Sequence, residues 1–276
     1  VIASDTDSIY VRFDELVSRV NPKNPVDFLD TIAKEKIEPF INKSYQELAD
    51  YTTAFDQKMF MKREVIADKG IWTAKKRYIL NAWDVEGVRY HQPELKIMGI
   101  EAVKSSTPAP CRAKIKEALK IIMSGDEKEL NDFLIAFRDE FTKLEPEVIA
   151  YPRSVNGIRK FGSSHSIFRK GTPMHIKGAL IYNHMVREKK LGNKYPIIQD
   201  GEKIKYLELR QPNPIACNVI SFMTKVPSEL DIHKYIDYDS QYIKSFIEPL
   251  SFITNNIGWK IDRSFGTQTT LESFFG

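Results

Sequence analysis

The chain has 276 residues, of which 42% are hydrophobic and 28% charged, and its formal net charge is +4 with a pI near 8.8. These values are typical of a soluble globular protein with one large core or two smaller ones, and they exclude a disordered or collagen-like chain. No apolar run has the length of a membrane span and no signal-peptide pattern is present, so we expect no membrane segment. The two cysteines, Cys111 and Cys217, lack metal-ligand spacing and predict buried thiols in a reducing, cytoplasmic setting.

Residues 1–11 predict a β-hairpin, because two short apolar runs flank the polar tetrapeptide Asp5-Thr6-Asp7-Ser8. Side chains two residues apart on an extended chain project to the same side, so Asp5 and Asp7 are expected to converge beyond the turn. Paired carboxylates suit Mg²⁺ or Mn²⁺ and indicate a metal site for phosphoryl or nucleotidyl transfer. The alternative is an ordinary solvated turn. Because the chain begins at Val1, inside a predicted strand, we expect it to be one piece of a longer or split protein.

A long amphipathic helix is predicted next, with Asn24 as its cap and Pro25 as its first residue. Its apolar residues keep a spacing of about 3.6 up to Leu48. We expect Pro39 to kink or split this helix near Glu38, since proline removes a backbone donor and collides with the preceding turn.

Residues 58–91 predict an antiparallel meander rich in apolar and β-branched residues. We expect strands over 59–67 and 71–83, a first turn over 68–70 and a second over 86–87.

Three adjacent cations, Lys75-Lys76-Arg77, fall on the second of these strands and precede Tyr78. On a strand they would point to both faces, so one face must meet water or an anionic partner. A solvated edge strand guarded by charge explains them, and so does a nucleic-acid contact, which the neighbouring aromatic residues favour slightly.

The remainder of the chain is predicted to be mostly helical. An amphipathic helix should end at Ser124-Gly125, and a second should begin at Asp126, with Glu129 three residues on, and stop at Pro146. Further along, we expect a strand over 204–209 and a last amphipathic helix containing Pro249.

A basic stretch lies between residues 153 and 194, where ten lysines and arginines accompany one acid, Glu188. Such an excess indicates a surface that neutralises phosphates, whereas solubilising faces, the alternative, usually mix both signs. Three histidines in this stretch lack tight ligand spacing, so we expect no zinc site: His165, His175 and His184.

The C-terminus carries large apolar residues in a polar context, with the spacing Gln268, Leu271, Phe274 and Phe275. On a helical turn the last three would form anchors for a partner groove, each worth about 1.5–3 kcal/mol when buried. The alternative is a tail folded back on its own core.

Several of these motifs together resemble family B DNA polymerases of the T-even-type bacteriophage branch. Asp5-Thr6-Asp7-Ser8 is similar to motif C of that family, and the run from Lys75 to Tyr78 is similar to its basic primer–template motif. Residues 172–178 and 268–275 resemble the thumb and the clamp-binding tail. The resemblance covers the whole chain and implies an α+β fold, with the C-terminal half of an antiparallel palm (1–104), a mostly helical thumb (105–261) and a flexible tail (262–276).

The resemblance also implies roles for single residues. Asp7 would be a direct ligand of two catalytic Mg²⁺ ions, Asp5 the adjacent carboxylate and Glu64 an accessory acid, while Lys62 stands where the phage relatives carry an acid. The implied DNA-binding residues are Lys75, Lys76, Arg77, Tyr78, Arg159, Lys160 and Lys177. The implied clamp-binding residues are Gln268, Leu271, Phe274 and Phe275.

The function implied is the C-terminal part of a replicative DNA-directed DNA polymerase, acting on primer–template DNA and dNTPs in the host cytoplasm with a sliding clamp. The family's other metal-binding aspartate, its nucleotide-binding helix and its exonuclease carboxylates have no counterpart here, so an N-terminal polymerase portion is expected as a partner that shares the metal ions. Two other hypotheses remain open: a non-catalytic, clamp-tethered DNA-binding module, and a different two-metal enzyme such as a nuclease.

Overall fold

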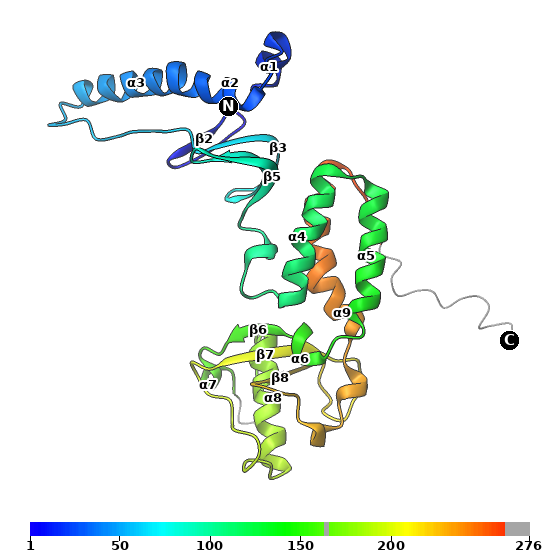
Figure 1. Cartoon of the computed structure of the whole chain (residues 1–276). Coiled ribbons are helices and arrows are strands. Elements are labelled where there is room, and N and C mark those ends of the chain that lie inside the picture. Colours follow the sequence, from blue (N-terminus) through cyan, green and yellow to red (C-terminus); the bar gives the residue numbers. More distant parts are fainter. Residues whose placement is uncertain (163–165, 263–276) are drawn as a thin grey trace. The chain divides into compact units, whose positions relative to one another are not determined.

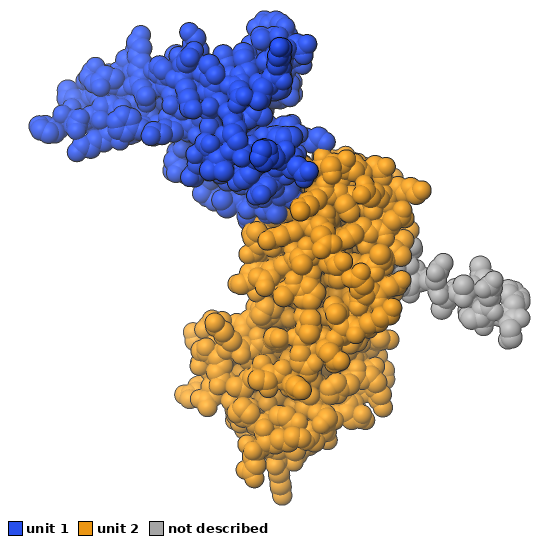
Figure 2. All heavy atoms as spheres, in the orientation of Figure 1, with its two compact units in different colours: residues 1–99 blue, residues 100–276 orange. Residues whose placement is uncertain are grey.

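The computed structural model describes residues 1–162 and 166–262. The chain forms two compact units, Val1–Gly99 and Ile100–Gly276 (Figure 2). Antiparallel sheets occur in both units together with helices, so the predicted α+β class is confirmed. The predicted C-terminal tail lies largely outside the described residues.

Unit 1 begins with the predicted hairpin, formed by β1 (Ala3–Asp5) and β2 (Ser8–Tyr10). The two strands are antiparallel and pair Asp5 with Ser8, so Thr6 and Asp7 form the turn. This prediction is confirmed because its signals, turn-forming residues between apolar ones, are local in the sequence.

Helices follow the hairpin, and the cap predicted at Asn24 is confirmed. Its side chain accepts hydrogen bonds from the backbone N–H groups of Val26 and Asp27 at 3.0 and 3.2 Å. Directly before Glu38 and Pro39 the helix widens into a π-helical turn, where the missing proline donor is accommodated instead of producing a break. The elements are α1 (Asp14–Val20), α2 (Pro25–Ile32), the π-helical turn (Ala33–Ile37) and α3 (Glu38–Tyr51).

The meander is present, but the bounds predicted for its first two strands, 59–67 and 71–83, are wrong. The strands are β3 (Val65–Ala74), β4 (Arg77–Val85) and β5 (Val88–Met98), antiparallel in the order β3-β4-β5. The turn expected over 68–70 lies inside β3, where the pairing register shifts. The polar, glycine-containing sequence there marks a strand irregularity and not a turn.

The first reversal of the meander takes place at Lys75 and Lys76, and Lys76 has a left-handed φ of 59°. Lys75 and Lys76 are therefore turn residues, and the prediction that they lie on a strand is wrong. The second turn, Glu86-Gly87, is confirmed, and its φ values of 53° and 89° match a tight hairpin turn.

Unit 2 contains a layer of helices (Figure 1), and buried aromatic side chains form its core. The rings of Phe137 and Phe246 lie 4.7 Å apart, and Tyr242 contacts both at 5.8 and 5.4 Å. The cap predicted at Asp126 is confirmed, since its carboxylate accepts a 2.8 Å bond from the Glu129 N–H. The elements are α4 (Ala109–Ser124), α5 (Glu127–Phe141), α9 (Tyr238–Tyr242), a π-helical turn (Ile243–Ile247) and α10 (Glu248–Thr254).

The same unit contains an antiparallel sheet, β6 (Tyr151–Ser154), β7 (Lys203–Glu208) and β8 (Val219–Phe222), with α8 (Met174–Glu188) packed against β8. A Cβ at Gly178 of α8 would lie 2.6 Å from the Ser221 hydroxyl oxygen, so the close approach of helix and strand requires glycine. The sequence predicted only β7. The short helices are α6 (Pro146–Ile149) and α7 (Ile158–Phe161), and 3₁₀ turns cover Glu101–Val103, Ser228–Leu230, His233–Tyr235 and Asn255–Ile257.

Both cysteines are free and buried, as predicted, and burial raises the pKa of the Cys111 thiol to about 11. None of the helices in the described part of the chain is both long and apolar enough to cross a membrane.

Candidate functional site

The hairpin turn of unit 1 presents two carboxylates with different surroundings. The Asp5 side chain is 24% exposed, and one of its oxygens accepts a 3.0 Å hydrogen bond from the Thr6 N–H. Asp7 is exposed at the tip of the turn. Asp5 is therefore held in place by its surroundings, whereas Asp7 faces solvent.

Lys76 links this hairpin to the meander. Its ammonium lies 2.8 Å from the second oxygen of Asp5, although the two residues are far apart in the sequence. The hydrogen bond from Lys76 lowers the pKa of Asp5, and the same bond, together with the charges of Asp5 and Asp7, raises the pKa of Lys76. Two of the motifs that carry the family resemblance thus meet in one place.

An aromatic cluster lies beside this ion pair. The Tyr10 ring, at the end of β2, contacts the rings of Trp72 and Tyr78 edge-on, with both centroid distances 5.4 Å. Burial raises the pKa of the Tyr78 hydroxyl, and its hydrogen bond with Tyr10 adds to the shift, so Tyr78 stays protonated at neutral pH. Tyr10 and Trp72 were not predicted as site residues; the signal in the sequence was the nearness of these aromatic residues to the two motifs.

Glu64, the predicted accessory acid, lies just before β3 and forms an ion pair with Lys96 of β5. Burial is the main cause of the raised pKa of Tyr78, and the charge of Glu64 adds to it. Lys62 is exposed.

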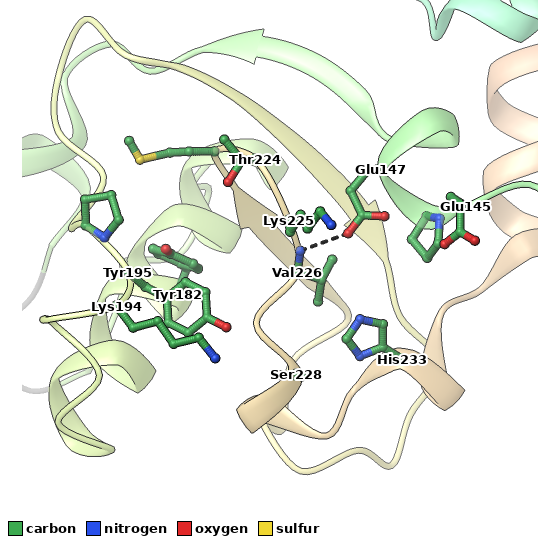
Figure 3. A pocket seen from close by; sticks show the side chains of 13 residues that line it. Glu145, Glu147, Tyr182, Lys194, Tyr195, Thr224, Lys225, Val226, Ser228 and His233 are labelled. Carbon is green, nitrogen blue, oxygen red and sulfur yellow. Dashed lines mark hydrogen bonds between the residues drawn. The ribbon is translucent and has the colours of Figure 1, made fainter.

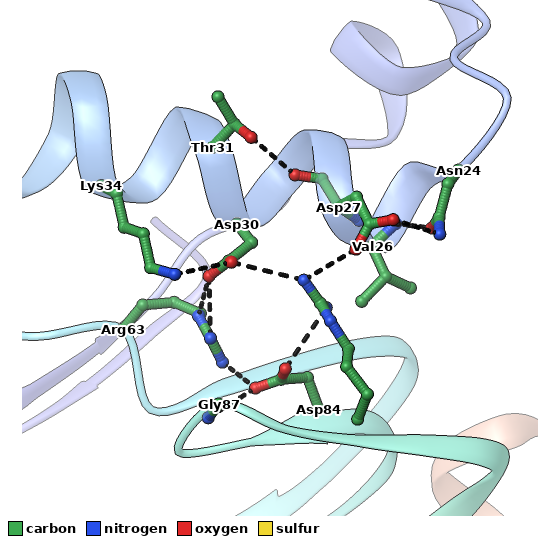
Figure 4. Close-up of polar contacts among 10 residues, drawn as sticks. Asn24, Val26, Asp27, Asp30, Thr31, Lys34, Arg63, Asp84 and Gly87 are labelled. Atoms are coloured by element: carbon green, nitrogen blue, oxygen red, sulfur yellow. Dashed lines mark hydrogen bonds and ion pairs between the residues drawn. The ribbon is translucent and has the colours of Figure 1, made fainter.

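Next to Glu64, Arg63 is the centre of a charged network that ties α2 to the meander (Figure 4). Its guanidinium donates 2.9 and 2.8 Å bonds to Asp30 and also pairs with Asp84, which is completely buried. Arg89 lies 3.3 Å from the other Asp84 oxygen and 3.0 Å from Asp27. Hydrogen bonds from Lys34 and Arg63 lower the pKa of Asp30. Sequence reasoning missed this network, because its members come from three separate segments.

The carboxylates near the hairpin have the oxygen donors that a magnesium ion prefers, but there are too few of them to hold the ion. Asp5 and Asp7 offer hard oxygen atoms, and Glu64 lies apart from them, paired with Lys96. Within residues 1–162 and 166–262 there is no group of three or more histidine, cysteine, aspartate or glutamate side chains arranged to hold a metal ion. A metal at this hairpin needs further ligands from elsewhere.

The basic stretch of unit 2 is only partly open to solvent. Arg159 and Lys160 are exposed on α7, as a phosphate contact requires. Lys177 donates a 2.7 Å hydrogen bond to the Asn218 side chain and lies 4.9 Å from the centre of the Phe168 ring. Arg153 donates a 2.9 Å bond to the Ser106 carbonyl. Unequal access distinguishes these cations, which the sequence pattern treated alike.

Unit 2 also has a pocket of about 610 Å³, which contains none of the predicted site residues (Figure 3). Acids and cations both line it, including Glu147, Lys194 and His233. Glu147 accepts a 3.1 Å hydrogen bond from the Val226 N–H and thereby supports the pocket wall. Because its lining mixes both charges and holds none of the predicted site residues, this pocket gives no reaction class.

The clamp-binding residues Gln268, Leu271, Phe274 and Phe275, and also His165, lie outside the described residues. Their expected roles stay predictions.

Comparisons with known proteins support the resemblance in the sequence. The chain is 33% identical over 294 aligned positions to the DNA-directed DNA polymerase of Enterobacteria phage T4, a match covering all of this chain and 32% of that protein. It is 37% identical over 274 positions to the DNA-directed DNA polymerase of Escherichia phage RB69, covering 92% of this chain and 30% of that protein. The chain thus spans about a third of the length of these relatives. No family model matches it.

Proposed function

Because the chain is related along its length to one part of the T-even-type phage DNA polymerases, we propose that it is the C-terminal part of a replicative DNA-directed DNA polymerase. The observation that supports this most directly is the meeting of the Asp5–Asp7 hairpin with Lys76 and Tyr78. Residues 1–104 would be the C-terminal half of the palm, 105–261 the thumb and 262–276 the clamp-binding tail. The enzyme would work in the cytoplasm of the phage's host.

Each site residue has a role in this proposal. Asp7, exposed at the hairpin tip, would ligate metal directly, and Asp5 would be the adjacent carboxylate. The remaining ligands would come from the N-terminal portion of the polymerase. When bound, two Mg²⁺ ions would lower the pKa of the primer 3′-hydroxyl and stabilise the pyrophosphate leaving group. Glu64 would adjust the local charge.

The cations would hold DNA. Lys75, Lys76, Arg77 and Tyr78 would contact the minor-groove side of the new duplex. Arg159, Lys160 and Lys177 would contact its backbone. Gln268, Leu271, Phe274 and Phe275 would tether the enzyme to the sliding clamp, raising the local DNA concentration to about mM levels. This chain alone, without a nucleotide-binding helix, would bind DNA and lack synthesis.

The proposal is tested by Asp7→Ala in the complete enzyme, assembled from this chain and its N-terminal portion. Templated extension should fall by at least about 10³-fold, because a metal ligand supplies several kcal/mol of transition-state stabilisation, while primer–template affinity changes little. Asp56→Ala, at an exposed aspartate of the same unit, should leave extension intact. Near-normal extension by the Asp7→Ala enzyme would refute the assignment.

A second candidate is a DNA-binding module without catalytic activity. Lys76 already neutralises Asp5, and the described residues contain no complete metal-ligand cluster, both of which favour an inert hairpin. Replacing Lys75, Lys76 and Arg77 with alanine should flatten the salt dependence of DNA binding by roughly 0.9 per lost phosphate contact for either candidate. Only the polymerase predicts templated extension once the N-terminal portion is added.

A further inference from the structure

The helices of unit 1 bury little of themselves. Within α1 and α2 no residue is buried, and α3 buries only Ala49. Isolated helices as short as these are at best marginally stable in water. Most helical stability in proteins comes from the packing of an apolar face. Figure 1 shows α3 extending beyond the edge of the β3–β5 sheet, so the sheet does not provide such packing along its length.

The exposed side of α3 includes three large apolar side chains among its polar ones. Phe40, Leu48 and Tyr51 lie within about 80° of one another around the helix, given about 100° per residue. All three are exposed, and the segment after α3 adds three more exposed apolar side chains. We call these six residues the α3 apolar surface: Phe40, Leu48, Tyr51, Phe55, Met59 and Phe60, with exposed fractions between 46% and 106%.

Single exposed apolar residues are ordinary, but six in one stretch indicate a binding surface. A lipid surface is a poor fit, because membrane-binding helices carry a strongly basic polar face. Here the polar residues of α3 carry both signs, and Lys43 is paired with Glu47 at 3.7 Å. A protein partner suits this surface better.

We propose that the α3 apolar surface is the docking surface for the polypeptide that forms the other two-thirds of the polymerase. This inference rests on the proposed function. The occupant follows from length: the T4 and RB69 relatives are about three times as long as the region matched, and this chain spans 32% and 30% of them. Much more polypeptide therefore accompanies this region in those proteins than the chain contains, and unit 1, which carries the α3 apolar surface, has the thinner core.

The test joins this chain to the unmatched part of the RB69 polymerase in one polypeptide and follows amide hydrogen exchange in α3. We expect α3 amides to exchange at least about tenfold more slowly in the chimera than in this chain alone, because packing suppresses local opening. Phe40→Asp with Leu48→Asp should remove that protection. Ile135→Asp, at an equally exposed apolar residue on α5, is the matched control and should leave it unchanged.

Templated extension by the chimera separates the two proposals. Protection of α3 without extension supports the docking surface and contradicts the proposed activity. Extension with unprotected α3 amides, or protection that persists in the Phe40→Asp, Leu48→Asp double variant, overturns the docking surface. The proposed polymerase function is unaffected by either result. Sedimentation of this chain alone should give a monomer; a dimer abolished by Leu48→Asp would assign the surface to a second copy and overturn the proposal.

Discussion

The two units are stabilised by different means. Among the described residues, six apolar side chains are buried in unit 1 and forty in unit 2. Unit 2 has a dense aromatic core, whereas unit 1 relies on strand pairing and on the Arg63 network with its buried Asp84. The unit with the predicted chemistry is thus the one with the smaller apolar core, so its stability depends more on polar contacts and on any bound partner.

The largest expected effect concerns the unit 2 core. Phe137→Ala should destabilise unit 2 by about 3–5 kcal/mol, because it opens a cavity among Phe141, Tyr242 and Phe246. Urea unfolding followed by hydrogen exchange of α5 measures this. Ile135→Ala, at an exposed residue of the same helix, should change stability by less than about 0.5 kcal/mol. Equal losses in the two variants would show that the aromatic core does not dominate unit 2.

The corresponding change in unit 1 is Asp84→Ala, which leaves Arg63 in a mostly buried position without its closest acid. We expect a loss of about 3 kcal/mol, at the lower end for a broken buried pair because Arg89 is partly open to water. Hydrogen exchange of β4 should rise while that of α5 stays unchanged. A wild-type exchange rate in β4 would show that the network is dispensable, and the comparison between units would fail.

The clearest pH effect on stability is expected in unit 2. The hydrogen bond from Lys194, with others from Tyr195, the backbone and Ser228, lowers the pKa of Glu229 from 4.5 to about 2. A depressed acid stabilises the fold above its unfolded pKa, and this stabilisation is lost as pH falls from about 4.5 through about 2. Glu229→Gln should therefore flatten the acid side of the unit 2 melting profile. A profile that keeps its slope would contradict the pairing.

The smallest effect is local to the hairpin. Lys76→Ala should raise the pKa of Asp5, because the hydrogen bond and charge that depress it are removed. A carboxyl ¹³C titration by NMR measures this shift. Lys75→Ala, in the same turn, is the control and should leave the pKa of Asp5 where it is. Identical titrations of wild type and Lys76→Ala would rule out the ion pair in solution.

Local signals made part of this structure predictable. The hairpin at Asp5–Ser8, the caps at Asn24 and Asp126 and the Glu86-Gly87 turn each depend on a few adjacent residues, and all are confirmed. The boundaries of β3 were not predictable, because its bulges, set by pairing with β4, gave polar residues a turn-like pattern.

The candidate site divides in the same way. The residues Asp5, Asp7 and Lys76 were identified from their own motifs, but the contact between Lys76 and Asp5 depends on how distant segments fold together. The same holds for Tyr10 against Trp72 and for Arg63 against Asp84. No spacing within a short window carries that information.

The π-helical turn over Ala33–Ile37 determines the direction in which α3 presents its side chains. Such a turn is geometrically an α-helix with one residue inserted and absorbed in a wider turn, whereas a residue inserted into a regular α-helix rotates everything beyond it by about 100°. Loss of one residue within this turn would restore a regular helix and leave the rotational phase of α3 unchanged. An insertion or deletion within α3, between Phe40 and Leu48, would instead turn Leu48 and Tyr51 away from Phe40. The turn is therefore a place where the length of this chain can vary while the facing of α3 is preserved.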